Sequence, residues 1–260
     1  MTANGRFVWY DLITTDLAAA RAFYTEVIGW TLTKFGETDY SMWTAPGDQA
    51  VGGIELMPEE ARKSGVPPHW LAHIQVEDVD ATVKKAQELG GRVHVPPTDI
   101  PNVGRFAIIA DPQGAVFSAF KPSDQTEHDP KGPGTFGWAE LNTTDYESAW
   151  KFYSELLGWK PTMAMDMGPG FGTYFMFGVS PDNPEKSLGG MSNAATMMQA
   201  PAHWMHYITV ADLEGTLARV TEKGGRVLNG PMDVPGGDRI AQCLDPQGGF
   251  FAVYARGGGQ

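Results

Sequence analysis

The segment that decides the fold is FVWYDLITTDLAAARAFYTEVIGW, residues 7–30, because it returns 129 residues later as FGWAELNTTDYESAWKFYSELLGW, residues 136–159. A second stretch, residues 69–120, aligns without a gap with residues 203–254 at an offset of 134, and the two share 21 identities in 52 positions. Internal repeats of this kind determine the architecture before any single residue is interpreted. The chain is therefore a tandem duplication.

The two copies are separated by residues 122–135, PSDQTEHDPKGPGT. This stretch contains three Pro and two Gly and almost no apolar side chains. Such a segment buries little surface and is typical of a linker. We therefore expect one domain over residues 1–121 and a second over residues 136–256.

The composition indicates a soluble protein that does not bind nucleic acid. The 260 residues are 42% hydrophobic, and 19 Lys or Arg face 31 Asp or Glu, a formal net charge of −12. An acidic surface repels phosphate backbones and anionic lipids. The single Cys243 excludes an intrachain disulfide and fits a reducing compartment. Because no apolar run approaches ~18 residues and no signal peptide precedes Asp11, we expect a cytoplasmic protein without a membrane partner.

Each copy shows the same order of strand and helix signals twice. Residues 7–13 alternate as a half-buried strand does, and Thr15 or Asp16 then provides a helix cap. The helix that follows has one apolar face and stops at Gly29, and short strands come after it. A second strand, residues 70–76, opens the next such series. Each copy thus reads βαβββ twice, which predicts an α+β fold.

These residues resemble the vicinal oxygen chelate superfamily of glyoxalase I, bleomycin-resistance proteins and extradiol dioxygenases. The marks are Asp16-Leu17, Phe23-Tyr24 and Gly29-Trp30, their repeats at Asp145, Phe152-Tyr153 and Gly158-Trp159, the Gly-Gly pair after the second helix of each copy, and the DPxG turns at Asp111–Gly114 and Asp245–Gly248. The resemblance implies two tandem domains, each of two βαβββ modules. Their strands would form a U-shaped, partly closed mixed sheet with helices outside, around a cavity open to small molecules.

Metal-using members of this superfamily carry a His or Gln in the first strand of each module and a Glu in the last. Carried over position by position, these places hold Trp9, Glu55, Leu71 and Ser118 in copy one, and Trp138, Ser192, Met205 and Ala252 in copy two. A catalytic metal needs about three protein ligands, and Glu55 alone qualifies. We therefore expect no metal and no cofactor.

A shifted metal site is the alternative in copy one. Asp11, Glu55, His69 and His73 all fall on predicted strands or strand edges, and two His with a carboxylate make a workable ligand set. The other interpretation is that each His satisfies ordinary hydrogen bonds. The recurrence of His69 as His203, each before a Trp, favours a structural turn.

Strand alternation predicts which side chains face the cavity. The expected ligand-binding residues are Trp9, Trp43, Gln75, Trp138, Glu140 and Tyr207. Asp11 and His73 occupy equivalent steps of the two modules of copy one, and the pseudo-twofold that the resemblance implies would bring them together as an acid–base couple, with Glu55 as a further catalytic candidate. A buried hydrogen bond without a catalytic role is the other interpretation of that pair. Arg105 and Arg239 either bind an anionic substituent or pin a hairpin.

The leading hypothesis is a metal-independent member of the superfamily, a monomer or homodimer, that binds a small apolar or aromatic metabolite or xenobiotic in its sheet cavity. The alternative is an enzyme, a glyoxalase-like lyase or isomerase, that uses a rebuilt metal site or the Asp11–His73 couple. A third hypothesis is an interaction module whose pockets are filled by the Trp side chains.

Overall fold

The computed structural model describes residues 4–36, 38, 40–124, 129–169, 171–180 and 187–257. Copy one comprises β1 (Phe7–Thr14), α1 (Leu17–Ile28), β2 (Thr31–Lys34), β3 (Ser41–Ala45), β4 (Gln49–Leu56), α2 (Glu59–Lys63), β5 (His69–Gln75), α3 (Val79–Glu88), β6 (Arg92–Ile100), β7 (Gly104–Ala110) and β8 (Val116–Pro122). Copy two comprises β9 (Phe136–Asn142), α4 (Tyr146–Leu157), β10 (Lys160–Asp166), β11 (Thr173–Gly178), β12 (Gly189–Ser192), α5 (Ala194–Met198), β13 (His203–Thr209), α6 (Leu213–Glu222), β14 (Arg226–Asp233), β15 (Arg239–Leu244) and β16 (Phe250–Ala255).

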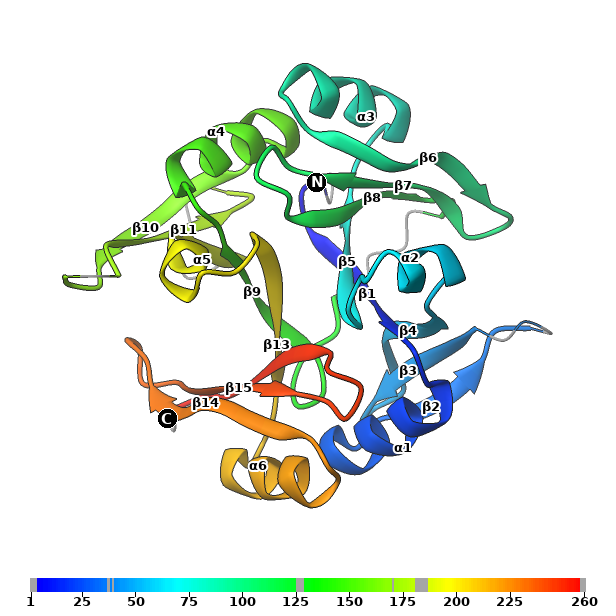
Figure 1. Cartoon of the computed structure of the whole chain (residues 1–260). Helices are drawn as coiled ribbons and strands as arrows, with labels where there is room; N and C mark the ends of the chain where they lie inside the picture. Colours follow the sequence, from blue (N-terminus) through cyan, green and yellow to red (C-terminus); the bar gives the residue numbers. More distant parts are fainter. Residues whose placement is uncertain are drawn as a thin grey trace. The chain divides into compact units, whose positions relative to one another are not determined.

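Each copy forms one eight-stranded sheet accompanied by helices (Figure 1). The strand order is β2-β3-β4-β1-β5-β8-β7-β6 in the first sheet and β10-β11-β12-β9-β13-β16-β15-β14 in the second. β1 pairs with β4 and β5 with β8 in parallel, whereas the hairpins pair antiparallel, so the sheets are mixed. Each sheet has an edge strand at either end, and neither sheet closes into a barrel. The expected α+β fold of two tandem domains is thereby confirmed.

The exact domain boundaries stay a prediction. β8 ends at Pro122 and β9 begins at Phe136, which fits a connection near the expected place. Residues 125–128 of the expected linker lie outside the described residues.

The helices that open each copy begin and end on local signals. The Asp16 carboxylate accepts hydrogen bonds from the backbone N–H groups of Ala18 and Ala19, each at 3.0 Å, and Asp145 caps α4 in the same way. Caps of this kind stabilise a helix by roughly 1 kcal/mol. Gly29 and Gly158 end α1 and α4 with φ angles of 84° and 73°, a left-handed conformation that glycine adopts without strain. The expected cap at Asp16 and stop at Gly29 are confirmed.

The chain divides into two compact units that do not coincide with the two copies. Unit 1 comprises Met1–Val8, Ala72–Asp129 and Ala139–Trp204, and unit 2 comprises Trp9–Leu71, Pro130–Trp138 and Met205–Gln260. Within unit 1, α3 packs beside α4, and within unit 2, α1 packs beside α6 (Figure 1). Each unit therefore combines one module from each copy.

Aromatic side chains fill the core of each unit. In unit 1, Trp159 stacks on Phe177 at a centroid distance of 4.1 Å, and its indole N–H donates to the carbonyl of Gly5 at 2.7 Å. In unit 2, the repeated residue Trp30 donates to the carbonyl of Gly134 at the same distance. Burying such large rings with their N–H groups satisfied supplies much of the hydrophobic stabilisation.

A buried Trp–Tyr–Asp chain joins the two copies inside each unit. In unit 1, Trp204 Nε1 donates to the Tyr153 hydroxyl, which donates to Asp111 Oδ2, both at 3.1 Å. Asp111 Oδ1 also accepts three backbone N–H groups of the DPQG turn. In unit 2, Trp70, Tyr24 and Asp245 repeat the chain at the same two distances. The Phe-Tyr helix motif of one copy is thus tied to the DPxG turn of the other.

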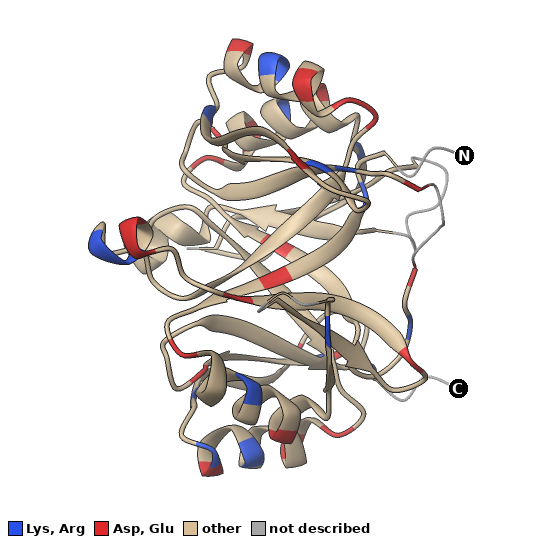
Figure 2. Cartoon of the chain, turned by 90° about the vertical axis from the view of Figure 1, so that its right-hand side faces the viewer, with Lys and Arg blue, Asp and Glu red and all other residues tan. Residues whose placement is uncertain are grey.

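Charged residues gather on the helices and turns, and most of the strand ribbon in Figure 2 is uncharged. Among the described residues, no helix has the length and hydrophobicity required to span a membrane.

Candidate functional site

Three side chains of copy one form a polar network on the sheet face opposite the helix core. The Trp9 indole N–H donates to the Tyr40 hydroxyl at 2.7 Å and lies 3.1 Å from Asp11 Oδ1. The Tyr40 hydroxyl in turn donates to Asp11 Oδ1 at 2.7 Å. Asp11 is only 8% exposed, so these bonds compensate for the water that its carboxylate has lost. The structure thus brings together Trp9 and Asp11, two residues predicted from the sequence, around Tyr40.

A glycine makes room for this network. A Cβ atom at Gly53 of β4 would overlap the hydroxyl of Tyr40 and crowd the Asp11 carboxylate. Burial, followed by the neighbouring Asp11 carboxylate, raises the pKa of the Tyr40 phenol far above its usual range. The phenol is therefore a permanent hydrogen-bond donor at neutral pH and not a base.

Copy two repeats this arrangement with a longer bond. The Tyr174 hydroxyl lies 3.2 Å from Glu140 Oε2, and Glu140 occupies the place of Asp11. A Cβ atom at Gly190 of β12 would overlap the Tyr174 ring, as one at Gly53 would overlap Tyr40. The same arrangement of a Tyr, a carboxylate and a Gly therefore occurs in both copies.

Other predicted residues of copy two lie in an apolar cluster. Trp138 packs against Met205, Tyr207, Ala252 and Tyr254. The Tyr207 hydroxyl accepts a hydrogen bond from Gln242 Nε2 at 3.3 Å. Trp138, Met205 and Ala252 are three of the four places where the superfamily holds metal ligands, so apolar groups fill this part of copy two.

His73, Gln75 and His69 all lie on β5. His73 is buried, its ring is roughly perpendicular to that of Phe120 at a centroid distance of 5.8 Å, and it pairs in register with Ser118 of β8. His69 Nδ1 lies 2.8 Å from the carbonyl of Pro67, and burial lowers the pKa of this imidazole. Asp11 belongs to unit 2 and His73 to unit 1, and the couple between them stays a prediction.

Trp43 lies away from the proposed ligand-binding face. It is fully buried with its ring 5.4 Å from Trp30 and 5.9 Å from Tyr24 of α1, centroid to centroid. Ser41, Trp43 and Ala45 are the buried positions of β3, so Trp43 belongs to the helix side of the sheet. Trp43 therefore lies on the sheet face opposite the one that carries Trp9, Asp11 and Tyr40.

The side chains at the superfamily's ligand places do not suit a metal. Trp9 and Leu71 offer no ligand atom, Glu55 is exposed, and Ser118 offers a neutral hydroxyl that has no hydrogen-bond partner in the described part of the chain. The described residues contain no group of three His, Cys, Asp or Glu side chains placed to hold a metal ion. Among the described residues, the family's ligand places in copy one therefore hold one carboxylate, Glu55, and the shifted site stays a prediction.

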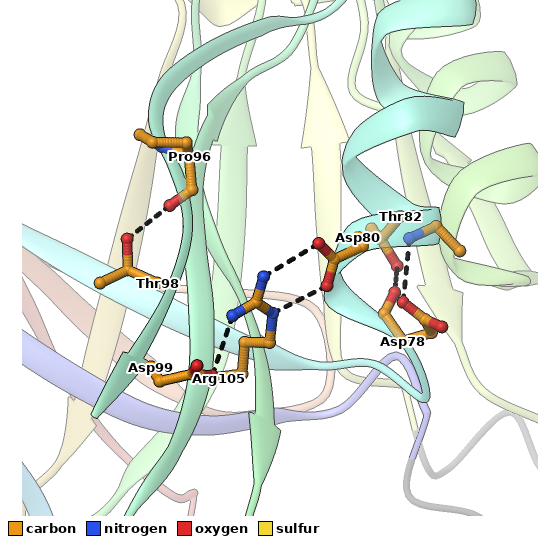
Figure 3. A network of polar contacts seen from close by, with 8 residues as sticks. Asp78, Asp80, Thr82, Pro96, Thr98, Asp99 and Arg105 are labelled. Atoms are coloured by element: carbon orange, nitrogen blue, oxygen red, sulfur yellow. Dashed lines mark hydrogen bonds and ion pairs between the residues drawn. The ribbon is translucent and has the colours of Figure 1, made fainter. Parts of the chain in front are cut away.

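Arg105 of β7 links the β6–β7 hairpin to α3. Its guanidinium donates to both carboxylate oxygens of Asp80 on α3, at 2.7 and 2.9 Å, and to Asp99 of β6 at 2.9 Å (Figure 3). Arg239 makes the corresponding bonds with Glu214 and Asp233 in copy two. Two carboxylates neutralise each Arg, which favours the hairpin interpretation over binding of an anion.

Tyr40 is the site residue that the cavity-face prediction for copy one did not include. A signal existed in the repeat, because Tyr40 recurs as Tyr174 and Gly53 as Gly190. The contact itself depends on the pairing of β3 with β4, which places Met42 opposite Gly53.

The family model of the Glyoxalase/Bleomycin resistance protein/Dioxygenase superfamily matches residues 6–118 and 135–253. The chain belongs to this superfamily.

Two named relatives are similar over nearly their whole length. The putative glyoxylase CFP32 of Mycobacterium tuberculosis (strain CDC 1551 / Oshkosh) is 35% identical over 250 residues, which cover 94% of this chain and 92% of the relative. The anthracycline biosynthesis protein DauV of Streptomyces sp. (strain C5) is 33% identical over 264 residues, with 96% and 93% covered.

Solved structures share the fold. The Mn(II)-bound glyoxalase from Novosphingobium aromaticivorans matches with a TM-score of 0.65 at 16% identity, covering 97% of this chain and 82% of that one. The 2,3-dioxygenase LapB from Pseudomonas sp. KL28 also has a TM-score of 0.65, at 13% identity, covering 98% and 94%.

Proposed function

We propose that this chain is a metal-independent member of the superfamily that binds a small apolar or aromatic molecule on the sheet face carrying Trp9, Asp11 and Tyr40. One observation carries the proposal: the first-strand ligand place of copy one holds the Trp9 indole, whose N–H is bonded to Tyr40. A broad aromatic face beside a fixed polar group suits a flat ligand with one polar substituent.

The name of one relative supports the same ligand class. DauV is named as an anthracycline biosynthesis protein, and anthracyclines are flat, polycyclic aromatic molecules. The acidic net charge of −12 favours neutral or cationic ligands over anionic ones. A cytoplasmic location and a monomeric or homodimeric state belong to this proposal as well.

The proposal is tested by titrating chelator-treated protein with an uncharged dihydroxyanthraquinone while Trp fluorescence is recorded. We expect saturable quenching that added Zn²⁺, Ni²⁺ or Fe²⁺ does not change, and at least a ~5-fold weaker affinity in Tyr40→Phe, which loses one buried hydrogen bond. Tyr146→Phe is the matched control, because Tyr146 also contacts a carboxylate, Glu147, but lies on α4. Stoichiometric metal in purified protein, or the lack of saturable quenching, would contradict the proposal.

The second candidate function is a glyoxalase-like lyase or isomerase. Two observations favour it: a relative is named a putative glyoxylase, and Asp11 and His73 are both buried titratable groups of copy one. If they act as an acid–base couple, Asp11→Asn and His73→Ala each lower turnover by ~10²-fold or more with little change in affinity. Loss of affinity alone would favour the binding protein.

A further inference from the structure

Three methionines lie on one sheet face of copy two. The matching places of copy one hold a single methionine. In the β10–β11 hairpin, Met163 pairs in register with Met176, and Met165 with Tyr174. Residues paired directly across two antiparallel strands project from the same face of the sheet. Since Tyr174 reaches Glu140 from this face, the three methionines stand beside the Tyr174–Glu140 pair. We call Met163, Met165 and Met176 the methionine ladder.

The ladder is accessible to a ligand. Met163 is 48% exposed, and Met165 and Met176 are half-buried. The turn beyond the ladder adds the exposed side chains of Met167 and Phe171. A group of exposed apolar side chains beside a polar pair is typical of a binding surface.

The repeat within the chain provides an internal comparison. The pair Met163–Met176 of copy two corresponds by register to the pair Thr33–Met42 of copy one. In copy one, the ring of Phe35 packs roughly perpendicular to the ring of Tyr40. Thioethers are polarisable, adapt to a flat ring and make favourable sulfur–aromatic contacts. The two copies therefore share the Tyr–carboxylate pair but differ in the surface that would cover a ligand ring.

Charge narrows the class of ligand further. After Lys160, the sequence contains no Lys or Arg until Lys186, whereas Glu140 places a carboxylate on β9. A carboxylate offers about four lone-pair positions, so Glu140 can accept from a ligand in addition to Tyr174. The Glu140 carboxylate therefore favours a neutral or cationic ligand over an anionic one.

We infer that the methionine ladder is the ring-binding surface of a copy-two site whose ligand is a planar aromatic molecule bearing a hydroxyl or protonated amine that donates to Glu140. This inference rests on the proposed function, because it names the ligand class of one of the two repeated elements.

The test follows the methionine methyl groups by NMR in full-length protein labelled at methyl-¹³C methionine. Proflavine, a planar aromatic cation, is the probe, and an anthracene carboxylate of similar size is its anionic counterpart. We expect saturable upfield shifts of the three ladder methyls with proflavine, because they would lie over the ring. Met197 and Met198, which are exposed on α5, serve as internal controls and should not move.

A double variant tests the energetic contribution. Met163→Thr/Met165→Gln removes the two ladder methionines of β10, and Met163→Thr copies the residue of copy one. We expect about a tenfold weaker affinity for proflavine, whereas the matched double variant Met197→Thr/Met198→Gln keeps the affinity of the parent.

The outcomes separate this inference from the proposed function. Saturable Trp quenching with unmoved ladder methyls would overturn the inference and leave the proposed function standing. The lack of saturable quenching by any aromatic probe would overturn both. Equal shifts with the anthracene carboxylate would overturn the role assigned to Glu140.

Discussion

At the scale of single residues, the Tyr40 phenol joins the indole of Trp9 to the carboxylate of Asp11. β1 places Trp9 and Asp11 two residues apart and therefore on the same face, and the phenol arrives from the segment before β3. The carboxylate is thereby held in one orientation. This order is what a recognition site needs, because a ligand then meets polar groups that are already positioned.

Removing the phenol oxygen should therefore destabilise copy one more than copy two. Tyr40→Phe leaves Asp11, which is buried, with one bond fewer, at a cost of about 1–3 kcal/mol. Tyr174→Phe should cost less, because its bond to Glu140 is longer, at 3.2 Å, and Glu140 is less buried than Asp11. Urea unfolding of both variants measures the difference, and equal losses would contradict the ranking.

His206 predicts a dependence of stability on pH. It is fully buried, its ring lies 5.1 Å from that of Tyr10, centroid to centroid, and burial lowers its pKa to about 3. An unfolded His titrates near 6.5. Between these values the unfolded chain binds a proton that the folded chain does not, so stability falls as the pH falls through this window.

At pH 4 the contribution of His206 amounts to a loss on the order of 3 kcal/mol relative to pH 7. We expect His206→Gln to lose correspondingly less stability on acidification, measured by urea unfolding at both pH values. Burial raises the pKa values of Asp111 and Asp245, which contributes with the opposite sign but equally in both proteins. Parallel losses in the two proteins would show that His206 does not titrate in this way.

At the scale of elements, the sequence predicts what depends on near neighbours. The ends of α1 follow from Asp16 and Gly29, because caps and stops act within one helical turn. The face of β3 does not follow, because Met42 and Trp43 offer apolar side chains to both sides and alternation alone leaves the choice open.

The polar network of copy one also depends on residues that are distant in the sequence, so local patterns could not predict it. Tyr40 and Asp11 are 29 residues apart, and their contact needs the space above Gly53 as well as the register of β3 against β4. Alternation places Asp11 on the same strand face as Trp9, but it carries no information about which distant side chain reaches Asp11.

The element-scale prediction concerns the link between α4 and the DPQG turn. Tyr153→Phe deprives Asp111 Oδ2 and Trp204 Nε1 of a partner in a fully buried site, and we expect a loss of about 1–3 kcal/mol in unfolding free energy. Tyr24→Phe should cost a similar amount, because Asp245 and Trp70 repeat the geometry. Thermal and urea unfolding check this. Tyr146→Phe is the surface control, and a loss no larger than its own would contradict the prediction.

At the scale of the whole molecule, each compact unit contains segments from both copies. We therefore expect the two halves to stay together after the chain is cut between them. A protease site inserted in place of residues 125–128 allows the cut, and size-exclusion chromatography reads the result. The halves should co-elute under native conditions and separate in denaturant. Separation under native conditions would show that each copy holds together by itself.

The Trp–Tyr–Asp chains have a consequence for how such a protein evolves. Because they join opposite copies, an unfused ancestor with one copy would have to find a second polypeptide, and its folding would depend on concentration. Fusion makes that encounter intramolecular, so assembly no longer depends on how much protein the cell makes. After fusion, each copy always has its partner copy in the same chain, so the two sheet faces can evolve separately. Thr33 in one copy and Met163 at the matching place of the other are an example of this divergence.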